Sequence, residues 1–376
     1  MTYPGPGDEP YVGPPPTRRP EPWERAHAYW PPVPGPVLWD RPPPPPPPAV
    51  RRAAPPAVRW APPPGTPPHD LPQPYLLVMR SRDWAWWRPL LGLLLLAVVY
   101  LVAATVVVFL TLATGIGPDF AQMDLADPLT LLFTNLSLIV AIPVVWLAWV
   151  TAHGMSRTWS SSVLARLRWR LVLPYSLMAL ATLGAGIGLS VLAGFLVGDE
   201  HVTGPVASFG WLLLVVLLTT PLQSAAEEYL FRGYLSQSIA TWVRHPVAGA
   251  VTAGVVTAAL FSAAHLPPDV PTFLDRFAFG LAASAVVWLT GGLEAAIVLH
   301  AVNNVLVFVL AGALGEGVIT EQVPGGAGLL FLLVSLLSVA AYVALVGRSR
   351  RRLLPETHTA ALDLRTPGVP APVAAG

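Results

Sequence analysis

The run Leu90–Thr114, LLGLLLLAVVYLVAATVVVFLTLAT, contains 25 residues and no charged side chain. About 20 consecutive apolar residues are enough to cross the hydrocarbon core of a bilayer as an α-helix. Seven further apolar runs follow it. The eight predicted spans are 90–114, 129–151, 171–197, 206–222 continuing as helix to about 243, 247–266, 272–290, 292–313 and 326–347. The predicted fold class is therefore all-α, a polytopic transmembrane helical bundle.

The composition of the whole chain agrees with residence in a lipid bilayer. Of its 376 residues, 54% are hydrophobic and only 11% are charged, whereas soluble domains average about 25% charged residues. The net charge is +1, which by itself says little about partners. We expect no nucleic-acid partner. The chain contains no cysteine, which excludes disulfides, thiolate metal sites and a cysteine nucleophile.

The segments that flank the predicted bundle differ sharply from it. Residues 1–75 hold 28 of the 44 prolines, a composition that favours polyproline II and cannot bury enough apolar surface to fold. We interpret them as a disordered Pro-rich cytoplasmic tail, with docking to a proline-recognising partner as the alternative reading. Residues 76–89 form a juxtamembrane Arg/Trp segment, and residues 348–376 form a second cytoplasmic tail.

Arginines mark one side of the predicted membrane topology. They occur before the first span at 80–88, between the second and third at 157–170, after the fourth at 244 and after the eighth at 348–352. All of these positions share one side when both termini are cytoplasmic, which satisfies the positive-inside rule. Arginine without lysine, and many Pro, Gly and Ala residues, indicate GC-rich bacterial codon usage. We therefore predict a multi-pass protein of a bacterial plasma membrane.

Three polar signatures interrupt the hydrophobic helices in the second half of the chain. An ionisable side chain at the centre of a bilayer costs about 2.5–3.5 kcal/mol on insertion scales, so retained ones usually have a function. The signatures are Glu227-Glu228-x-x-x-Arg232, Phe261-x-x-x-His265 and His300-x-x-x-Asn304. Together they indicate a hydrolytic site within the membrane.

The first signature separates two carboxylates by their positions around one helix. Glu228 and Arg232 lie four residues apart, share a helix face and can form an ion pair. Glu227 is rotated by about 100° and lacks that partner, so its side chain is suited to accept a proton from water. The alternative is a structural ion network at a helix end.

The second signature lies at the depth of the first when the chain folds as a helical hairpin. His265 follows Glu227 by 38 residues, and a turn near His245-Pro246 is almost equidistant from both. Phe261, one turn before His265, is expected to pack on the same face. The alternative is that His265 is a structural residue of the helix core or of the membrane interface, with no catalytic role.

The third signature offers polar donors from another span. His300 and Asn304 lie four residues apart and project from one face, where an amide can stabilise a developing oxyanion. The alternative is a polar clamp between helices. Glu227, His265 and His300 could also bind zinc with an open position for water. Because the chain lacks His-Glu-x-x-His and asparagine is a poor zinc ligand, we favour direct general-base chemistry over metal-dependent hydrolysis.

In this order and on successive hydrophobic helices, the three signatures resemble those of the CPBP family of intramembrane proteases. This family is also called the Abi or type II CAAX prenyl protease family, and the resemblance covers roughly residues 205–310. It implies an intramembrane endopeptidase whose mechanism is described both as metal-dependent and as glutamate-based. By this resemblance, Glu227 and His265 activate water, His300 and Asn304 hold the oxyanion, and Glu228 and Arg232 brace the site.

The resemblance implies a membrane-associated protein or peptide as substrate, in contact with the lipid bilayer. Bacterial relatives are also linked to bacteriocin self-immunity, so a non-catalytic scaffold or immunity protein that retains the protease fold is the competing hypothesis. A proton-relaying transporter is a third. It would need polar residues along a whole pathway, whereas here they cluster in three helices.

Overall fold

The computed structural model describes residues 68–69, 71–114, 124–197, 204–315 and 325–360. The chain divides into two units, Met1–Ala61 and Pro62–Gly376, and only the second contains described residues. Most of the expected Pro-rich tail and the end of the C-terminal tail therefore lie outside the described residues, as does the expectation of a proline-recognising partner.

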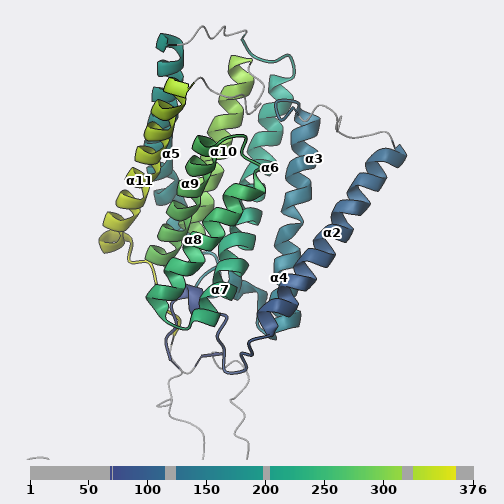
Figure 1. The fold of residues 1–376 in the computed structure, drawn as a ribbon, viewed down its shortest axis with the longest axis vertical. Helices are drawn as coiled ribbons and strands as arrows, with labels where there is room; N and C mark the ends of the chain where they lie inside the picture. The colour runs from purple at the N-terminus through teal and green to yellow at the C-terminus, as the bar shows by residue number, and fades with distance from the viewer. Residues whose placement is uncertain (1–67, 70, 115–123, 198–203, 316–324, 361–376) are drawn as a thin grey trace, which may run out of the picture. The chain divides into compact units, whose positions relative to one another are not determined.

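The described part of the chain is helical and confirms the predicted all-α fold (Figure 1). Its α-helices are α2 (Arg88–Thr114), α3 (Pro128–Ile139), α4 (Ala141–His153), α5 (Trp169–Val197), α6 (Phe209–Leu230), α7 (Ser236–Val243), α8 (Pro246–Ala264), α9 (Val270–Thr290), α10 (Glu294–Leu314) and α11 (Gly325–Leu353). A π-helical turn, η4 (Phe231–Leu235), joins α6 to α7.

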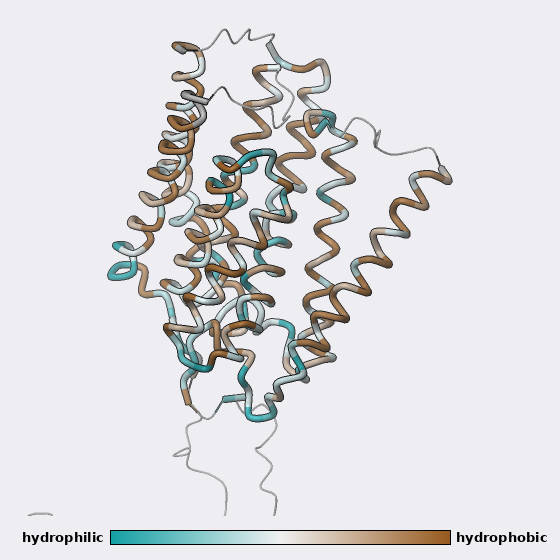
Figure 2. Tube along the Cα trace, in the orientation of Figure 1, coloured by the Kyte–Doolittle hydropathy of each residue, from teal (hydrophilic) through white to brown (hydrophobic). Residues whose placement is uncertain are grey.

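Among the residues that the structure describes, eight helical segments are long and apolar enough to cross a membrane, as predicted. Two of them are composite, because α3 continues into α4 as Pro128–His153 and α6 continues through η4 into α7 as Phe209–Val243. Figure 2 shows hydrophobic residues along most of each helix and hydrophilic residues concentrated in the connections at the lower end of the view. The chain is therefore a multi-pass membrane protein.

The hairpin between α7 and α8 turns where the sequence predicts. Helix α7 ends at Val243, Arg244 has a φ of 67°, and α8 begins at Pro246. Proline suits the first helical position because its fixed φ is helical and its missing N–H would have no partner there. The His245 side chain caps the helix by accepting a hydrogen bond from the Ala248 amide at 3.2 Å.

The far end of α8 is shaped by residues that cannot continue a helix. The helix ends at Ala264, and His265 is its C-cap. Leu266 has a φ of 47°, an unusual conformation for a branched residue, and Pro267-Pro268 follow. Asp269 then caps α9. His265 therefore lies at the C-terminal end of α8 and not within the helix.

Helix α10 lies among the helices that carry the other polar signatures. It packs against α6, α5 and α9, while α8 packs against α9 and α7. In Figure 1, α2 contacts the bundle mainly through α4 and diverges from α3 toward its C-terminal end. This packing lets α6, α8 and α10 contribute side chains to one place.

The packed part of the chain begins before the boundary that the prolines indicate at residue 75. The short helix η2 (Tyr75–Leu77) is buried, and Pro74 pairs with His358 in an isolated β-bridge. The apolar run that starts at Tyr75 drives this packing, because its side chains join the main hydrophobic core. The two terminal segments thus meet at one end of the bundle.

Candidate active site

Glu227 lies buried on α6, with one carboxylate oxygen bonded and the other without a hydrogen-bond partner. The Gln223 side-chain amide, one turn earlier, donates to Oε1 of Glu227. Oε2 is buried but accepts no hydrogen bond. Buried polar atoms are nearly always hydrogen-bonded in native proteins, so the unbonded Oε2 of Glu227 is unusual and can accept a hydrogen bond from a further group.

Two imidazoles face the free oxygen of Glu227. Nε2 of His265 lies 3.7 Å from Oε2, and Nε2 of His300 lies 3.9 Å from it. Both separations exceed the length of a direct hydrogen bond, so these atoms lie close together without being bonded to one another. The hairpin of α7 and α8 and the packing of α10 on α6 therefore bring all three groups to one depth.

The tautomers of both histidines follow from their other ring nitrogens. Nδ1 of His265 lies 2.8 Å from the Phe261 carbonyl oxygen, and Nδ1 of His300 lies 3.0 Å from Oε1 of Glu228. Both partners only accept hydrogen bonds, so each Nδ1 carries a proton, and each ring in its neutral form has a lone pair on Nε2. Three acceptor atoms thus converge, and a group that donates hydrogen, such as water, would satisfy them.

Glu228 and Arg232 form the ion pair that their spacing predicts. Arg232 donates from Nη1 to Oε1 of Glu228 at 3.0 Å, and both side chains are 0% exposed. The same oxygen accepts the bond from His300, so Glu228 connects α6 to α10. Arg232 also donates from Nη2 to the Gly280 carbonyl on α9 at 3.0 Å. This network orients His300 through its Nδ1 proton.

Two local features allow Arg232 to reach its partners. It lies in the π-helical turn η4, a type of irregularity often found at functional sites. Gly280 permits the close approach of α9, because a Cβ there would lie 2.9 Å from Ala258 Cα and 3.3 Å from Arg232 Nη2. A larger residue at position 280 would therefore displace the guanidinium or α8.

The Phe261 ring contacts both imidazoles. Its ring centroid lies 4.5 Å from that of His265 and 5.6 Å from that of His300. The Arg232 guanidinium carbon lies 4.9 Å above the same ring, a cation–π contact. Phe279 on α9 lies 5.4 Å from His300 and completes the apolar wall. These rings lower the local dielectric around the charged groups.

Asn304 reaches the site through Gln223. Its Nδ2 donates to Oε1 of Gln223 at 3.3 Å, and Gln223 in turn donates to Glu227. The neighbouring Asn303 does not reach Gln223 but donates to Oδ1 of Asn304 at 3.2 Å. A single side chain, that of Gln223, therefore links Asn304 to the Glu227 carboxylate. Asn304 and His300 lie four residues apart on one face of α10.

Burial lowers the pKa of the His265 imidazole, although the nearby Glu227 carboxylate opposes this shift. His265 lies beyond the last residue of its helical span and its side chain is 33% exposed. The lowered pKa favours the neutral ring at neutral pH. His265 is thus held in the form that can accept a proton.

The donor atoms at this site match zinc in kind but not in arrangement. Zinc binds imidazole nitrogen and carboxylate oxygen at about 2.0–2.2 Å, with three protein ligands in catalytic sites. Among the described residues, no group of three or more His, Cys, Asp or Glu side chains is arranged to hold a metal ion. Glu227, His265 and His300 therefore do not fit such a site in this conformation.

A cavity of about 450 Å³ leads to Glu227 and His265. Its other walls are apolar and come from α2, the α3–α4 span, α6 and α8, and its lining includes Leu96, Tyr100 and Phe231. This volume lies within the range of about 300–1,000 Å³ that is typical of ligand sites. The two residues can therefore meet a substrate from the side of α2.

The sequence motifs missed three groups that shape the site: Gln223, Gly280 and Phe279. Gln223 lies one helical turn before Glu227, so its position on the same face is a signal that the sequence contains. Gly280 and Phe279 lie on α9, and only the packing of α9 on α8 and α10 brings them to the site. No spacing rule within α9 indicates that role.

Comparisons with known proteins support the resemblance drawn from the motifs. Residues 208–306, which include all of the candidate residues, match the family model described as type II CAAX prenyl endopeptidase Rce1-like. The uncharacterized protein YyaK of Bacillus subtilis (strain 168) is 25% identical over 239 residues, covering 58% of this chain and 75% of that protein. No solved structure gives a significant match. Over residues 208–306 the chain is therefore similar to the family of type II CAAX prenyl endopeptidases.

Proposed function

We propose that this protein is an intramembrane endopeptidase that hydrolyses a peptide bond of a membrane-associated protein or peptide. The observation that carries the proposal is the convergence of three acceptors, Oε2 of Glu227 and Nε2 of His265 and His300, with separations of 3.7 and 3.9 Å from the carboxylate oxygen. A water molecule between Glu227 and His265 would donate one hydrogen to each, which aligns its lone pair for attack.

In the proposed reaction, the water oxygen forms a bond to the carbonyl carbon while its proton passes to Glu227. The carbonyl π electrons move onto the oxygen and give a tetrahedral oxyanion. Collapse of this intermediate breaks the C–N bond, and the proton held by Glu227 passes to the leaving nitrogen. The products are a carboxylic acid and an amine, which exchange the second water proton to give a carboxylate and an ammonium group, and the Glu227 carboxylate is regenerated.

We assign the stabilisation of the oxyanion to Asn304 and His300. Asn304 supplies an amide N–H whose present acceptor is Gln223 at 3.3 Å, a bond that can be exchanged for one to substrate. His300 would donate to the oxyanion from Nε2 once both of its ring nitrogens carry protons, while its Nδ1 stays bonded to Oε1 of Glu228 at 3.0 Å. The Glu228–Arg232 pair would then position His300 without touching the substrate.

The experiment compares the full chain and two variants in vesicles that contain membrane proteins of the source organism. New protein termini are identified by mass spectrometry. The wild-type chain should generate termini that Glu227→Gln does not. Asp275→Asn is the matched control, since it removes a different, half-buried carboxylate, on α9, and should leave these termini unchanged.

The competing function is a membrane scaffold or immunity protein that acts by binding. Identical termini from the wild type and Glu227→Gln would contradict hydrolysis at this site and favour the competing function. Treatment with a chelator forms a second arm. Loss of the wild-type termini, restored by added zinc, would show that the mechanism depends on a metal and would overturn the direct general-base proposal.

A further inference from the structure

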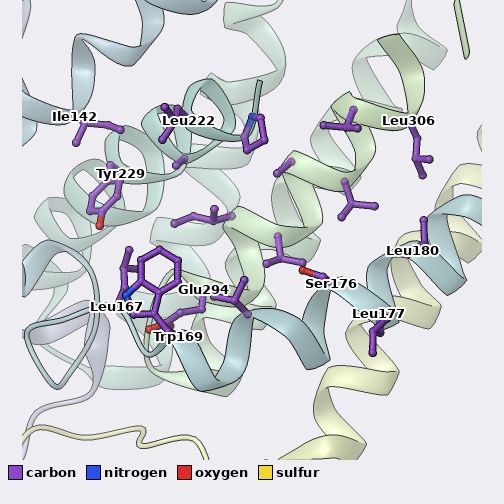
Figure 3. Close-up of a pocket in the computed structure, with 18 of the residues that line it drawn as sticks. Ile142, Leu167, Trp169, Ser176, Leu177, Leu180, Leu222, Tyr229, Glu294 and Leu306 are labelled. Atoms are coloured by element: carbon purple, nitrogen blue, oxygen red, sulfur yellow. The ribbon is translucent and has the colours of Figure 1, made fainter. Parts of the chain in front are cut away.

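A second cavity lies on the opposite side of the helices that carry the candidate active site. Its volume is about 630 Å³, and its walls come from α4, α5, α6 and α10. Figure 3 shows Leu222 of α6 and Leu306 of α10 on its walls, together with Leu177 and Leu180 of α5. We call this cavity the α5 groove. It shares no lining residue with the cavity at Glu227.

The lining of the α5 groove offers almost nothing for a peptide to hydrogen-bond. Glu294 has both carboxylate oxygens bound by Arg168, and the Tyr229 hydroxyl is hydrogen-bonded to Ser161 at 2.7 Å. The remaining polar groups in the lining are the Ser176 hydroxyl and the indole N–H groups of Trp146 and Trp169, and Nε1 of Trp146 has no hydrogen-bond partner. An extended peptide would leave backbone groups without partners at a cost of several kcal/mol each. A hydrocarbon chain has no such requirement.

One end of the α5 groove is aromatic and basic. Trp146, Leu167 and Trp169 line it, and Trp169 is 74% exposed. The Arg157 guanidinium lies 4.9 Å above the Trp146 ring, and the exposed Arg166 immediately precedes Leu167. Tryptophan is enriched where a bilayer meets water, and arginine near a membrane surface attracts anionic lipid.

The other charges at this end of the α5 groove are already paired. Arg168 bonds with Glu294, and Arg170 bonds with Glu356 at 3.0 Å. The segment 154–170 contains no acidic residue, so Arg157 and Arg166 leave an excess of two positive charges beside the aromatic mouth. The apolar length and the basic end are therefore complementary to one kind of molecule with an apolar chain and an anionic head.

We propose that the α5 groove binds an anionic phospholipid, with an acyl chain along the apolar wall and the phosphate-containing headgroup beside Arg157 and Arg166. This site goes beyond the proposed hydrolysis and does not depend on it. Because α6 and α10 form its wall on one side and carry Glu227 and His300 on the other, the bound lipid would brace the same helix pair that holds the active site.

The test is native mass spectrometry of the full chain in detergent, with phosphatidylglycerol and phosphatidylcholine of identical acyl chains added separately. We expect preferential retention of one phosphatidylglycerol. Each of Arg157→Gln and Arg166→Gln should weaken that retention about fivefold. Arg352→Gln is the matched control, since it removes an exposed arginine at the end of α11 and should have no effect.

A second pair of variants tests the apolar part of the groove. Ser176→Phe fills it from α5 and should reduce retention of both lipids, whereas Ala185→Phe adds the same ring to an exposed position of α5 outside the groove and should not. Equal retention of the two headgroups, or no effect of Ser176→Phe, would overturn the proposal. A co-purifying peptide or a dimer that is lost only in Ser176→Phe would also overturn it, because a protein would then occupy the groove.

Discussion

Two buried arginine–glutamate pairs occur in the part of the chain that the structure describes, and they differ in how many of their polar atoms are hydrogen-bonded. Arg168 bonds with Glu294 at 2.6 and 2.9 Å, and it also donates to the carbonyls of Thr290 and Glu356 at 3.0 and 2.7 Å. All three guanidinium nitrogens and both Glu294 oxygens are used. This pair joins the end of α9, the start of α10 and the C-terminal segment.

The pair at the candidate site leaves polar atoms unused although it is equally buried. Oε2 of Glu228, Nε of Arg232 and Oε2 of the neighbouring Glu227 have no hydrogen-bond partner. A buried ion pair is weak evidence for function or for stability, since its desolvation cost offsets the attraction. The two pairs therefore differ in how many of their polar atoms are hydrogen-bonded, and not in burial.

The largest expected effect separates catalysis from stability at Glu227. With a cleaved peptide in hand, Glu227→Gln should lower the hydrolysis rate by about 10²–10⁴-fold, the range for loss of a general base. Its melting temperature should not fall, because the substitution removes a buried charge without breaking the ion pair. Cleavage kinetics and thermal unfolding in detergent measure the two effects. A lowered melting temperature with normal cleavage would reverse the assignment.

The clamp should show the opposite behaviour. Arg168→Leu leaves Glu294 buried without its partner, and such a change lowers the free energy of unfolding by about 3–5 kcal/mol. The double variant Arg168→Leu/Glu294→Leu should recover part of this loss, because no unpaired charge remains. Thermal unfolding of the three proteins measures it. Equal stability of Arg168→Leu and the wild type would show that the clamp does not hold α10.

Substitution of Asn304 tests the part of the site that is proposed to bind the oxyanion. Removing one oxyanion donor costs about 10²–10³-fold in kcat, so Asn304→Ala should show a loss of that order with little change in KM. Asn303→Ala is the matched control, since that side chain contacts Asn304 and not Gln223. Steady-state cleavage rates decide. An increase of KM alone would indicate that Asn304 binds substrate in its ground state.

The smallest expected effect concerns pH. Burial lowers the pKa of His265, and the nearby Arg276, which donates to the His265 carbonyl at 2.9 Å, lowers it further. Activity that needs neutral His265 should persist above its folded pKa and fall as pH drops below it, so the acid limb should lie below the usual histidine value of about 6.5.

Replacing Arg276 with Gln should raise the pKa of His265 and move that acid limb toward higher pH. The pH dependence of kcat/KM in the wild type and Arg276→Gln measures the shift. A limb that stays in place would show that another group controls the rate on the acid side.

The sequence predicts the spans and the helical hairpin because both depend on local chemistry. Long apolar runs specify the spans, and Pro246 specifies the start of α8, which places His265 level with Glu227. The four-residue spacing likewise predicts the Glu228–Arg232 pair. These features need only the period of a helix and the conformational limits of proline.

The contacts between helices could not be predicted, because they depend on how each helix is rotated about its axis. The bond from His300 to Glu228 requires α10 to present one face to α6, and the bond from Arg232 to Gly280 requires close packing of α9. The π-helical turn at Phe231–Leu235 also changes the rotation locally. No periodicity in the sequence specifies these angles.

The continuous helix Phe209–Val243 has 35 residues and is thus about 52 Å long, compared with a hydrocarbon layer of roughly 30 Å. Its last turns carry buried polar side chains, including Ser236, Gln237 and Thr241, and α7 packs against α8 and η2. Tilting the helix cannot by itself fit this length into the hydrocarbon layer, so the Val243 end of the helix projects beyond the acyl chains. Glu227 lies 16 residues, or about 24 Å, before the end of this helix, so the length that projects decides how deep the carboxylate lies in the bilayer.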